Sequence, residues 1–565
     1  MTTNGNEVTT EKHVSDIIGM DFIEWFGRII LIGCGTGRGK TYFALNVYVK
    51  WLLSQGKRVL YLCNRKKLEE QIDEDVIRYK LPEEKNYSRF TAISYQKFKE
   101  RIEHGLVADY DVYICDEAHY FLADAGFNLY TDIPYFHILN KPGATVLFMT
   151  ATYWNILERL KRDIDNSDEL IEYYLPTDYS YVKHICWYKK QKDLYGIIDT
   201  ILKKRPNDKI LYFCNSNEKM KQLYEHYDPS HGKTENPDLL KESKLRFMSF
   251  ICSDGTQNKW MKTHCFNEVE VTEIDPVTQE ETKKKVLVPK AGLIRSEYGG
   301  YTFDSRMLIT TKVVDNGIDF KDTAIKHIIL DVFDIESALQ CLGRKRCLTD
   351  EIEEEDTCNF YIRDWQSRQM NIFLQQVQDE LTSPRLFIED YEQWISKYGN
   401  DREKKDKTIY YDYNDREWKV NPLRYDKLVG DEALIIRMKN KEISYRTIVI
   451  SKIGDIARER SMDIENIKAE VVKTDLDIWL ELHVNKRLSK QEQAELINLC
   501  DIKDKFNRKQ KSIKVVSAYI EQNFPYKLQS KVFKEEGKSV RNWQLTPRKK
   551  KSQDETAEPE ESEPP

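Results

Sequence analysis

Short apolar runs alternate with helical patterns through the first 180 residues, and this alternation restricts the chain to an α/β fold built on a parallel sheet. The runs are almost continuously apolar, as is typical of strands that helices cover on both faces. They lie at residues 27–33, 58–63, 111–116 and 144–150. Residues 41–55, between the first two runs, predict a helix that Gly56 ends.

A second set of strand-like runs follows, at residues 209–214, 306–311 and 326–331, with a helical pattern at 218–227. Between them, residues 268–289 alternate in polarity and contain Asp275-Pro276, which indicates a hairpin inserted into the second sheet. The two sets predict two sheets of one architecture.

Changes in composition divide the chain into five parts. We expect a first lobe at 1–180, a second lobe at 181–348, an accessory mixed α/β region at 349–480, a basic module at 481–545 and a disordered tail at 546–565. The order helix, basic turn, helix, hairpin in 488–545, with the hairpin turning at Glu536-Gly537, resembles a winged helix. Its lysines and arginines suit either contact with nucleic acid or a solvated packing surface.

Composition limits the class of protein and the cellular compartment to be expected. The 565 residues carry 88 Lys and Arg against 94 Asp and Glu, a net charge of −6, which argues against a uniformly basic binding protein. No apolar run reaches the roughly 18 residues of a membrane span, and the polar N-terminus lacks the apolar core of a secretory signal. The eleven cysteines form no CxxC pair, which fits reduced thiols. We therefore expect a soluble, cytoplasmic protein without a membrane partner.

The first apolar run leads into Cys34-Gly35-Thr36-Gly37-Arg38-Gly39-Lys40-Thr41, and the predicted helix follows at once. In such a loop, backbone N–H groups and the helix N-terminus hold phosphate groups. Lys40 would contact the β- and γ-phosphates of a bound nucleotide, and the Thr41 hydroxyl would bind Mg²⁺.

Asp116 and Glu117 stand at the end of the third apolar run, ahead of Ala118-His119. Asp116 is placed to hold Mg²⁺, and Glu117 to polarise the attacking water as a general base. The loop and this acidic pair together predict nucleotide hydrolysis.

These motifs, together with Thr150-Ala151-Thr152 and the segment Gln340 to Arg346, occur in the order found in superfamily 2 helicases of the DEAD/DEAH-box kind, which the chain resembles over about residues 20–348. The resemblance implies two RecA-like lobes, ATP and Mg²⁺ as cofactors, and movement along nucleic acid. It also implies catalytic roles for Gln340, Arg344 and Arg346, and roles at the lobe interface for Gly317 and Asp319.

The chain departs from the family pattern at three points. Cys34 replaces the first glycine of the loop, and no glutamine upstream is recognisable as a reader of adenine. The arginines are spaced as Gly343-Arg344-Lys345-Arg346 and not as GRxxR, which resembles phage-type replication and origin-binding helicases. Either Arg344 or Arg346 can be the arginine that completes the ATP site.

The resemblance further implies contacts with the backbone of a nucleic acid from short polar or basic residues near strand ends. These residues are Asn64, Arg65, Thr91, Thr150, Thr152, Asn215 and Thr311. DNA is the favoured track, RNA stays open, and replication or defence proteins are candidate partners. The alternative is a nucleotide-switched protein that binds DNA or recognises an origin without separating strands.

Overall fold

The computed structural model describes most of the chain. The described residues are 13–35, 37–64, 89–126, 128–165, 169–214, 216–227, 248–252, 258–274, 281–290, 293–311, 318–348, 353–399, 407–463, 475–500, 502, 508–535 and 538–547. Four of the site residues expected from the sequence lie outside them: Thr36, Arg65, Asn215 and Gly317. Two expected turns, at Asp275-Pro276 and Glu536-Gly537, also lie outside the described residues.

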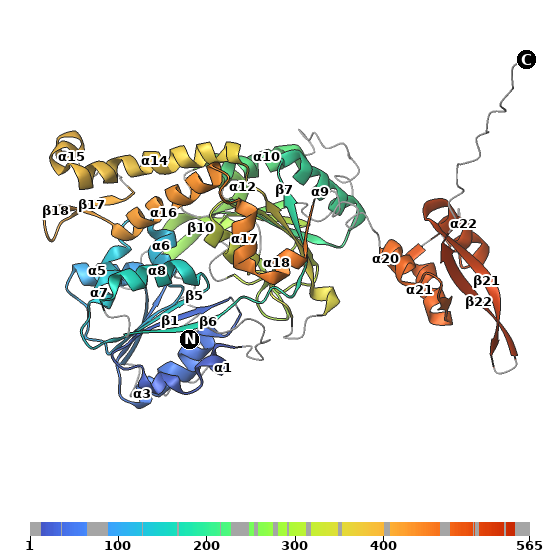
Figure 1. The fold of residues 1–565 in the computed structure, drawn as a ribbon, viewed down its shortest axis with the longest axis horizontal. Helices are drawn as coiled ribbons and strands as arrows, with labels where there is room; N and C mark the ends of the chain where they lie inside the picture. Colours follow the sequence, from blue (N-terminus) through green and yellow to red (C-terminus); the bar gives the residue numbers. More distant parts are fainter. Residues whose placement is uncertain are drawn as a thin grey trace, which may run out of the picture. The chain divides into compact units, whose positions relative to one another are not determined.

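The first lobe is a six-stranded sheet in which every pair of strands is parallel, in the order β3-β2-β4-β5-β1-β6 (Figure 1). The strands are β1 (Ile29–Cys34), β2 (Val59–Cys63), β3 (Phe90–Ser94), β4 (Val112–Cys115), β5 (Thr145–Thr150) and β6 (Leu170–Leu175). Because side chains alternate along a strand, each face of the sheet has its own core.

Helices cover both faces of this sheet. On one face, Ile30 and Ile32 of β1 pack with α1 (Val14–Ile18) and with the helix that runs as α2 (Lys40–Tyr42), η2 (Phe43–Val49) and α3 (Lys50–Ser54). On the other face, Leu31 packs with α5 (Tyr95–Glu103), α6 (Tyr120–Ala123), α7 (Asp132–Leu139) and α8 (Tyr153–Asp163).

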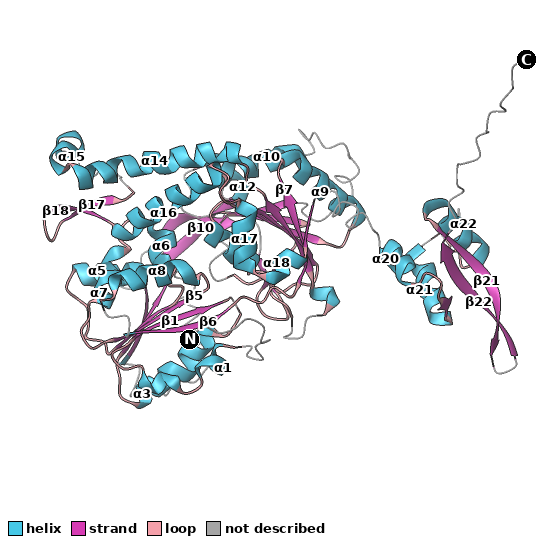
Figure 2. Ribbon diagram, in the orientation of Figure 1, coloured by secondary structure: helices cyan, strands magenta, loops and turns pink. Residues whose placement is uncertain are grey.

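The second lobe is a seven-stranded sheet, again with parallel pairs, in the order β19-β7-β16-β15-β8-β14-β9. Figure 2 colours strands, β7 among them, apart from the helices. The strands are β7 (Val182–Tyr188), β8 (Lys209–Cys214), β9 (Met248–Ile251), β14 (Met307–Thr310), β15 (Ile325–Asp331), β16 (Cys358–Arg363) and β19 (Ser461–Asp463). Two of them, β16 and β19, come from beyond residue 348, where the sequence placed the end of this lobe.

The second lobe also contains two hairpins and several helices. The inserted hairpin pairs β10 (Phe266–Ile274) with β11 (Glu281–Pro289), as the alternating pattern predicted. A smaller hairpin joins β12 (Leu293–Arg295) to β13 (Tyr301–Phe303). The helices of this part are α10 (Asn217–Tyr227), α12 (Lys259–Cys265) and α13 (Ile335–Leu342), and α9 (Gln191–Lys204) follows β7 along the chain. With its two parallel sheets, the chain has the predicted RecA-like α/β fold.

The accessory region is mainly helical. It contains α14 (Ser367–Glu389), α15 (Tyr391–Tyr398), the strand pair β17 (Ile409–Asp412) and β18 (Glu417–Val420), α16 (Pro422–Lys439), α17 (Tyr445–Ile453) and α18 (Asp455–Glu459). One helix, α16, packs against both lobes. Its Leu423 belongs to the core of the first lobe, and its Ile435 and Met438 belong to the core of the second.

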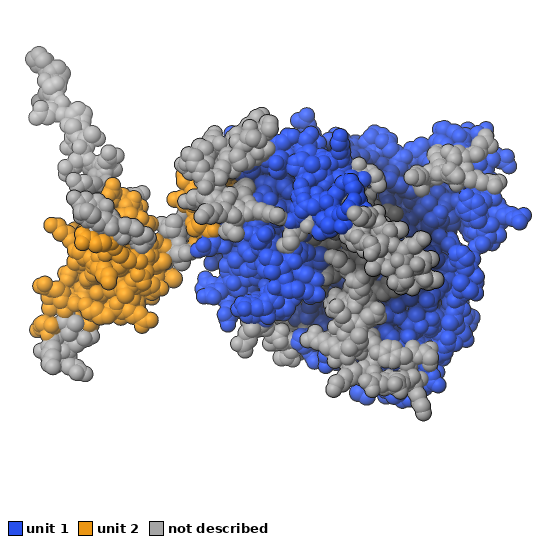
Figure 3. All heavy atoms as spheres, turned by 180° about the vertical axis from the view of Figure 1, so that it is seen from behind, with its two compact units in different colours: residues 1–194, 207–464 blue, residues 195–206, 465–565 orange. Residues whose placement is uncertain are grey.

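The chain divides into two compact units, coloured separately in Figure 3. Unit 1 comprises residues 1–194 and 207–464 and therefore holds both lobes; unit 2 comprises residues 195–206 and 465–565. The C-terminal part of unit 2 contains α20 (Asp475–Leu482), β20 (Arg487–Leu488), α21 (Lys490–Cys500), α22 (Ile513–Asn523), β21 (Tyr526–Glu535) and β22 (Lys538–Pro547).

The three strands of unit 2 form a sheet in the order β20-β22-β21. Its last strand ends at Pro547, two residues inside the segment that the sequence predicted to be disordered from residue 546. In the described parts of the chain, no helix is both long and apolar enough to cross a membrane.

Candidate nucleotide site

The glycine-rich loop lies between β1 and α2, where the sequence places it, and its glycines are required by close contacts. A Cβ on Gly35 would lie 2.4 Å from Oγ1 of Thr177, so no other residue fits there without a shift of the chain. Gly37 and Gly39 have φ of +84° and +80°, which favours glycine. Gly39 precedes the first turn of α2, whose N–H groups have no acceptor within the helix and are suited to phosphate.

Lys40 is buried at the start of α2 and points back into the loop. Its ammonium group donates to the carbonyl oxygens of Cys34 at 2.7 Å and Gly35 at 3.4 Å. The positive charge also acts on both acidic residues at the end of β4: it partly offsets the rise in the pKa of Asp116 and contributes to the low pKa of Glu117. The loop lysine and the acidic pair therefore share one site.

Asp116 and Glu117 follow β4 directly. Asp116 is buried, and its carboxylate accepts hydrogen bonds from the Tyr61 hydroxyl at 2.7 Å and from the backbone N–H of Glu117 at 2.9 Å. Glu117 has φ of +50°, a left-handed conformation that is uncommon for a residue with a side chain. Its carboxylate lies 3.4 Å from Nδ1 of His119.

The two carboxyl groups differ in how easily they ionise. Burial, reinforced by the adjacent Glu117, raises the pKa of Asp116 to about 6. Burial also opposes ionisation of Glu117, but the nearby His119, Lys40 and Arg344 outweigh it and hold the pKa of Glu117 well below its usual range. At neutral pH, Glu117 is therefore a carboxylate, the form that a general base requires.

The oxygen groups near the loop suit magnesium. The Thr41 hydroxyl stands on the first turn of α2, and the Asp116 carboxylate keeps acceptor positions beyond its two hydrogen bonds. A hydroxyl and a carboxylate are ligands that Mg²⁺ takes, together with waters and the phosphates of a nucleotide. The donor set therefore fits the metal that the sequence predicted.

The second lobe contributes two arginines on one side of an extended segment. Phe320 and Lys345 form a parallel bridge, in which the N–H of Phe320 donates to the carbonyl of Arg344 and the N–H of Arg346 to the carbonyl of Phe320, both at 2.8 Å. Because side chains alternate in extended backbone, Arg344 and Arg346 point one way and Lys345 the other. Lys345 is buried and pairs with Asp356. The GRKR spacing thus places both arginines on one side of the segment and Lys345 on the other.

Asp319 holds both arginines. Its Oδ1 lies 3.5 Å from Nη1 of Arg344 and 3.1 Å from Nη2 of Arg346. Arg346 also reaches the phosphate loop, because a Cβ on Gly37 would lie 3.1 Å from its Nη1. Arg344 is close enough to Glu117 to lower the pKa of that carboxyl. Two arginines of the second lobe thus meet the loop and the acidic pair of the first.

The Thr150-Ala151-Thr152 segment lies at the end of β5, next to the acidic pair. The N–H of Ala118 donates to the carbonyl of Met149 at 2.8 Å, so the two segments are joined through the backbone. Thr150 and Thr152 are both buried, and the Thr150 hydroxyl accepts from the N–H of Thr152 at 3.0 Å. These hydroxyls are engaged within the first lobe.

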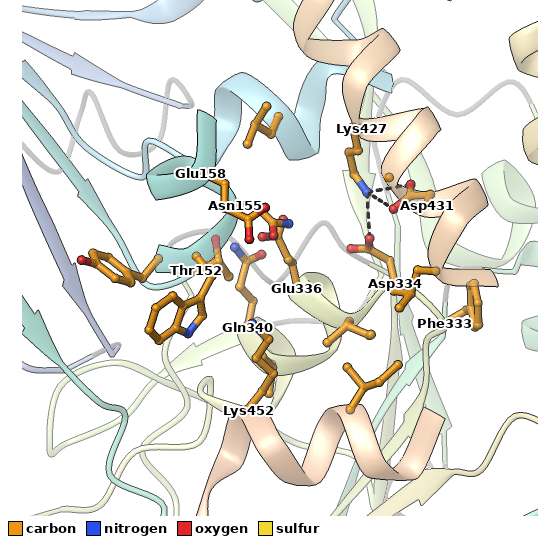
Figure 4. Close-up of a pocket in the computed structure, with 18 of the residues that line it drawn as sticks. Thr152, Asn155, Glu158, Phe333, Asp334, Glu336, Gln340, Lys427, Asp431 and Lys452 are labelled. Carbon is orange, nitrogen blue, oxygen red and sulfur yellow. Dashed lines mark hydrogen bonds and ion pairs between the residues drawn. The ribbon is translucent and has the colours of Figure 1, made fainter. Parts of the chain in front are cut away.

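A cavity of about 730 Å³ lies behind these segments, between the two lobes and the accessory helices (Figure 4). Gly35, Thr152 and Gln340 line it, so it adjoins the phosphate loop. Gln340 is 6% exposed, and its Nε2 has no hydrogen-bond partner among the described residues. Figure 4 shows Glu336 beside Gln340, on the same helix, α13.

Glu336 is a site residue that the sequence did not indicate. Burial, followed by the adjacent Asp334, raises its pKa to about 7. Its carboxyl group and His119 of the first lobe influence each other electrostatically, which links α13 to the acidic strand end. No motif marks Glu336, because its environment arises only when the lobes come together.

Two neighbouring residues of α16 connect the lobes beside this cavity. Asp426 accepts from Arg159 of α8 at 2.5 Å and from Arg162 at 3.1 Å. Lys427 donates to Asp334, which caps α13 in the second lobe, at 3.3 Å, and to Asp431 at 2.9 Å. Dashed lines in Figure 4 mark the contacts of Lys427.

Not all of the residues expected to contact nucleic acid lie at the carboxyl ends of strands. Asn64 is buried after β2, and its amide donates to Asp124 at 2.8 Å. Thr91 lies near the start of β3, and Ser94, not Thr91, stands at the carboxyl end and caps α5. Thr311 directly follows β14.

A comparison with known protein families finds a match within the first lobe. Residues 24–155 match the family model described as Type III restriction enzyme, res subunit, and this range contains the loop, the acidic pair and Thr150 to Thr152. No curated protein sequence matches the chain.

Solved structures similar to the chain include two of the S. cerevisiae protein Dbp5 bound to RNA and ADP BeF3. One is 13% identical, has a TM-score of 0.37 and covers 60% of this chain and 79% of its own. The other, a point variant, is 11% identical, has a TM-score of 0.38 and covers 79% and 90%.

Proposed function

We propose that the protein is an ATP-dependent helicase or translocase of superfamily 2, of the DEAH-box kind, that hydrolyses ATP between its two lobes. One observation carries the proposal: Lys40, Asp116 and Glu117 of the first lobe share a site with Arg344 and Arg346 of the second. A site completed by two lobes couples hydrolysis to their relative movement. The ordered motifs and the family match over 24–155 support the same assignment.

Each residue has a role in this proposal. The loop N–H groups and Lys40 bind the phosphates, and Glu117 orients and deprotonates the attacking water. Thr41 and Asp116 would hold Mg²⁺, which supplies positive charge to the phosphates when it is bound. Arg346, which reaches Gly37, stabilises the charge that develops on the transferred phosphoryl group.

We propose DNA as the favoured track, with RNA as the alternative. The basic C-terminal part of unit 2 and the GRKR spacing, which resembles that of phage-type replication helicases, support DNA. The backbone contacts expected from the lobes do not distinguish DNA from RNA unless a 2′-hydroxyl is read.

The test measures the rate of ATP hydrolysis without nucleic acid and with single-stranded DNA, duplex DNA or RNA. We expect one polymer to stimulate hydrolysis strongly, and Glu117→Gln to abolish the activity while ATP binding persists. Asp109→Asn is a matched control, since this carboxylate of the same lobe is largely exposed. A slow rate that no polymer changes would contradict a motor and favour the nucleotide-switched binding protein.

A further inference from the structure

In the C-terminal part of unit 2, the helices and the strands differ in the charges that they carry. Between residues 486 and 547 there are 14 Lys and Arg against 7 Asp and Glu. The described acidic side chains of this segment lie on helices, at Glu492 and Glu495 of α21 and Glu521 of α22. The strands carry exposed cations, at Lys527, Lys531, Lys534 and Arg541, and none of their described side chains is acidic.

The two faces of this sheet differ. One face holds Leu488, Leu528 and Leu545, which pack with Val516 and Ile520 of α22. The other face carries Arg487, Lys527 and Lys531, because the register sets Arg487 opposite Gln544 and Lys531 opposite Asn542. We call this second surface the open sheet face. Lys527 and Lys531 are exposed and form no ion pair with any described residue.

Arg487 is held in place on the open sheet face. Its guanidinium lies over the ring of Phe533, 4.9 Å from the centroid. With the amide oxygen of Asn542 turned toward it, the guanidinium donates to that oxygen from Nε and Nη2, both at 2.8 Å. A fixed guanidinium beside Lys531 is suited to a phosphate group, because little conformational freedom is lost on binding.

The same geometry disfavours recognition of bases. Proteins that bind single strands offer bare aromatic rings on which bases stack, but the guanidinium of Arg487 covers Phe533. Lys527 and Lys531 are four residues apart on β21, about 14 Å, so they reach different phosphates. Of the side chains of α22, only Lys514 is a cation, so this helix offers little to a DNA groove.

From this arrangement we propose that the open sheet face of unit 2 binds the phosphate backbone of duplex DNA without reading its sequence. The inference rests on the proposed action on nucleic acid and adds the surface and the kind of contact. The charges of the face complement a polyanion, and the covered ring points to a duplex, not a single strand.

The test measures the affinity of the full-length chain for a fluorescent DNA duplex at several salt concentrations. In Lys527→Gln/Lys531→Gln, we expect the slope of log affinity against log salt to fall in magnitude by about 2, since each phosphate contact contributes about 0.9. The control, Lys490→Gln/Lys514→Gln, removes two exposed lysines from the helices of the same unit and should keep the slope. Lys527→Arg/Lys531→Arg should bind as the unaltered chain does.

Three outcomes would overturn the inference: an unchanged slope in Lys527→Gln/Lys531→Gln, an equal fall in the control, or a loss confined to a single-stranded probe. Hydrolysis of ATP without DNA should be the same in every variant. Absence of hydrolysis in all chains, with the expected change in slope, would contradict the proposed function and leave the DNA-binding face intact.

Discussion

The ionisation of Asp116 is costly because its carboxyl group is buried beside Glu117, and among the described residues only Tyr61 donates a side-chain hydrogen bond to it. The pKa of this carboxyl is about 6 in the folded protein, against 3.8 for an unperturbed aspartate. The folded state therefore binds more protons than the unfolded state between these values. Stability falls as the pH rises from about 4 to 6, and the loss is complete above that range.

Asp116→Asn should therefore stabilise the metal-free protein at neutral pH while it abolishes hydrolysis. The asparagine keeps an acceptor for Tyr61 and removes the buried charge, and a pKa difference of about 2 corresponds to roughly 3 kcal/mol at most. Urea unfolding at pH 4.5 and pH 8 measures the effect. The gain should be larger at pH 8, and Asp109→Asn, an exposed carboxylate, should show no such gain. A gain that does not depend on pH would contradict this account.

Arg344 and Arg346 should fail in different ways when replaced. Arg346→Ala should lower kcat by about 10³ and leave KM for ATP nearly unchanged, because an arginine finger acts mainly in the transition state. Arg344→Ala should also raise the pKa of Glu117, since the charge of Arg344 lowers it. Because that pKa lies well below its usual range in the unaltered chain, Glu117 stays ionised above pH 5, so Arg344→Ala should lower kcat less than Arg346→Ala does.

Steady-state kinetics from pH 5 to 9 separates the two arginines. Ordinary values of kcat in Arg346→Ala, with a large loss in Arg344→Ala, would make Arg344 the finger instead.

The sequence predicts where the loop and the acidic pair stand in the fold, because each is contiguous and follows an apolar strand. It does not predict the surroundings of their side chains. The inward direction of Lys345 depends on its bridge to Phe320, and the raised pKa of Glu336 depends mainly on its burial. Such long-range contacts leave no local pattern.

At the scale of elements, the strands that the sequence revealed are those buried on both faces. The predicted runs at 58–63 and 144–150 became β2 and β5, which are wholly buried. The sequence missed β6 at the edge of the first sheet, where exposed and buried residues mix, and β3 at the other edge. Edge strands face water along one side, so they lack the continuous apolar signal.

The helix α16 joins the two lobes, and its charges make the joint testable. Asp426→Asn weakens the contact with Arg159, which is 6% exposed, so we expect a loss of roughly 1–2 kcal/mol in the free energy of unfolding. Because the lobes are then less firmly held, a non-hydrolysable ATP analogue should stabilise the variant less than the unaltered chain. Thermal unfolding with and without the analogue measures both effects.

The matched control is Asp163→Asn, which removes a partner of Arg159 on the same helix, α8, without touching the other lobe. It should lose stability but keep the full effect of the analogue. An equal reduction in both variants would show that α16 has no special part in joining the lobes.

At the scale of the whole molecule, the net charge of −6 is not evenly distributed along the chain. The chain as a whole is slightly acidic, yet its segment from 486 to 547 has twice as many basic as acidic residues. The ATP site lies in unit 1 and the open sheet face in unit 2. A chain built in this way can lose affinity for DNA without losing its catalytic residues.

The stimulation of hydrolysis by duplex DNA should therefore separate into two effects. In Lys527→Gln/Lys531→Gln, the DNA concentration for half-maximal stimulation should rise several-fold, while the rate at saturating DNA should stay the same. Raising the salt concentration should bring the half-maximal DNA concentrations of the variant and the unaltered chain closer together. The variant releases fewer counterions on binding, so its affinity falls less steeply with salt. A fall in the saturating rate instead would mean that the open sheet face takes part in coupling DNA to the ATP site, and not in binding alone.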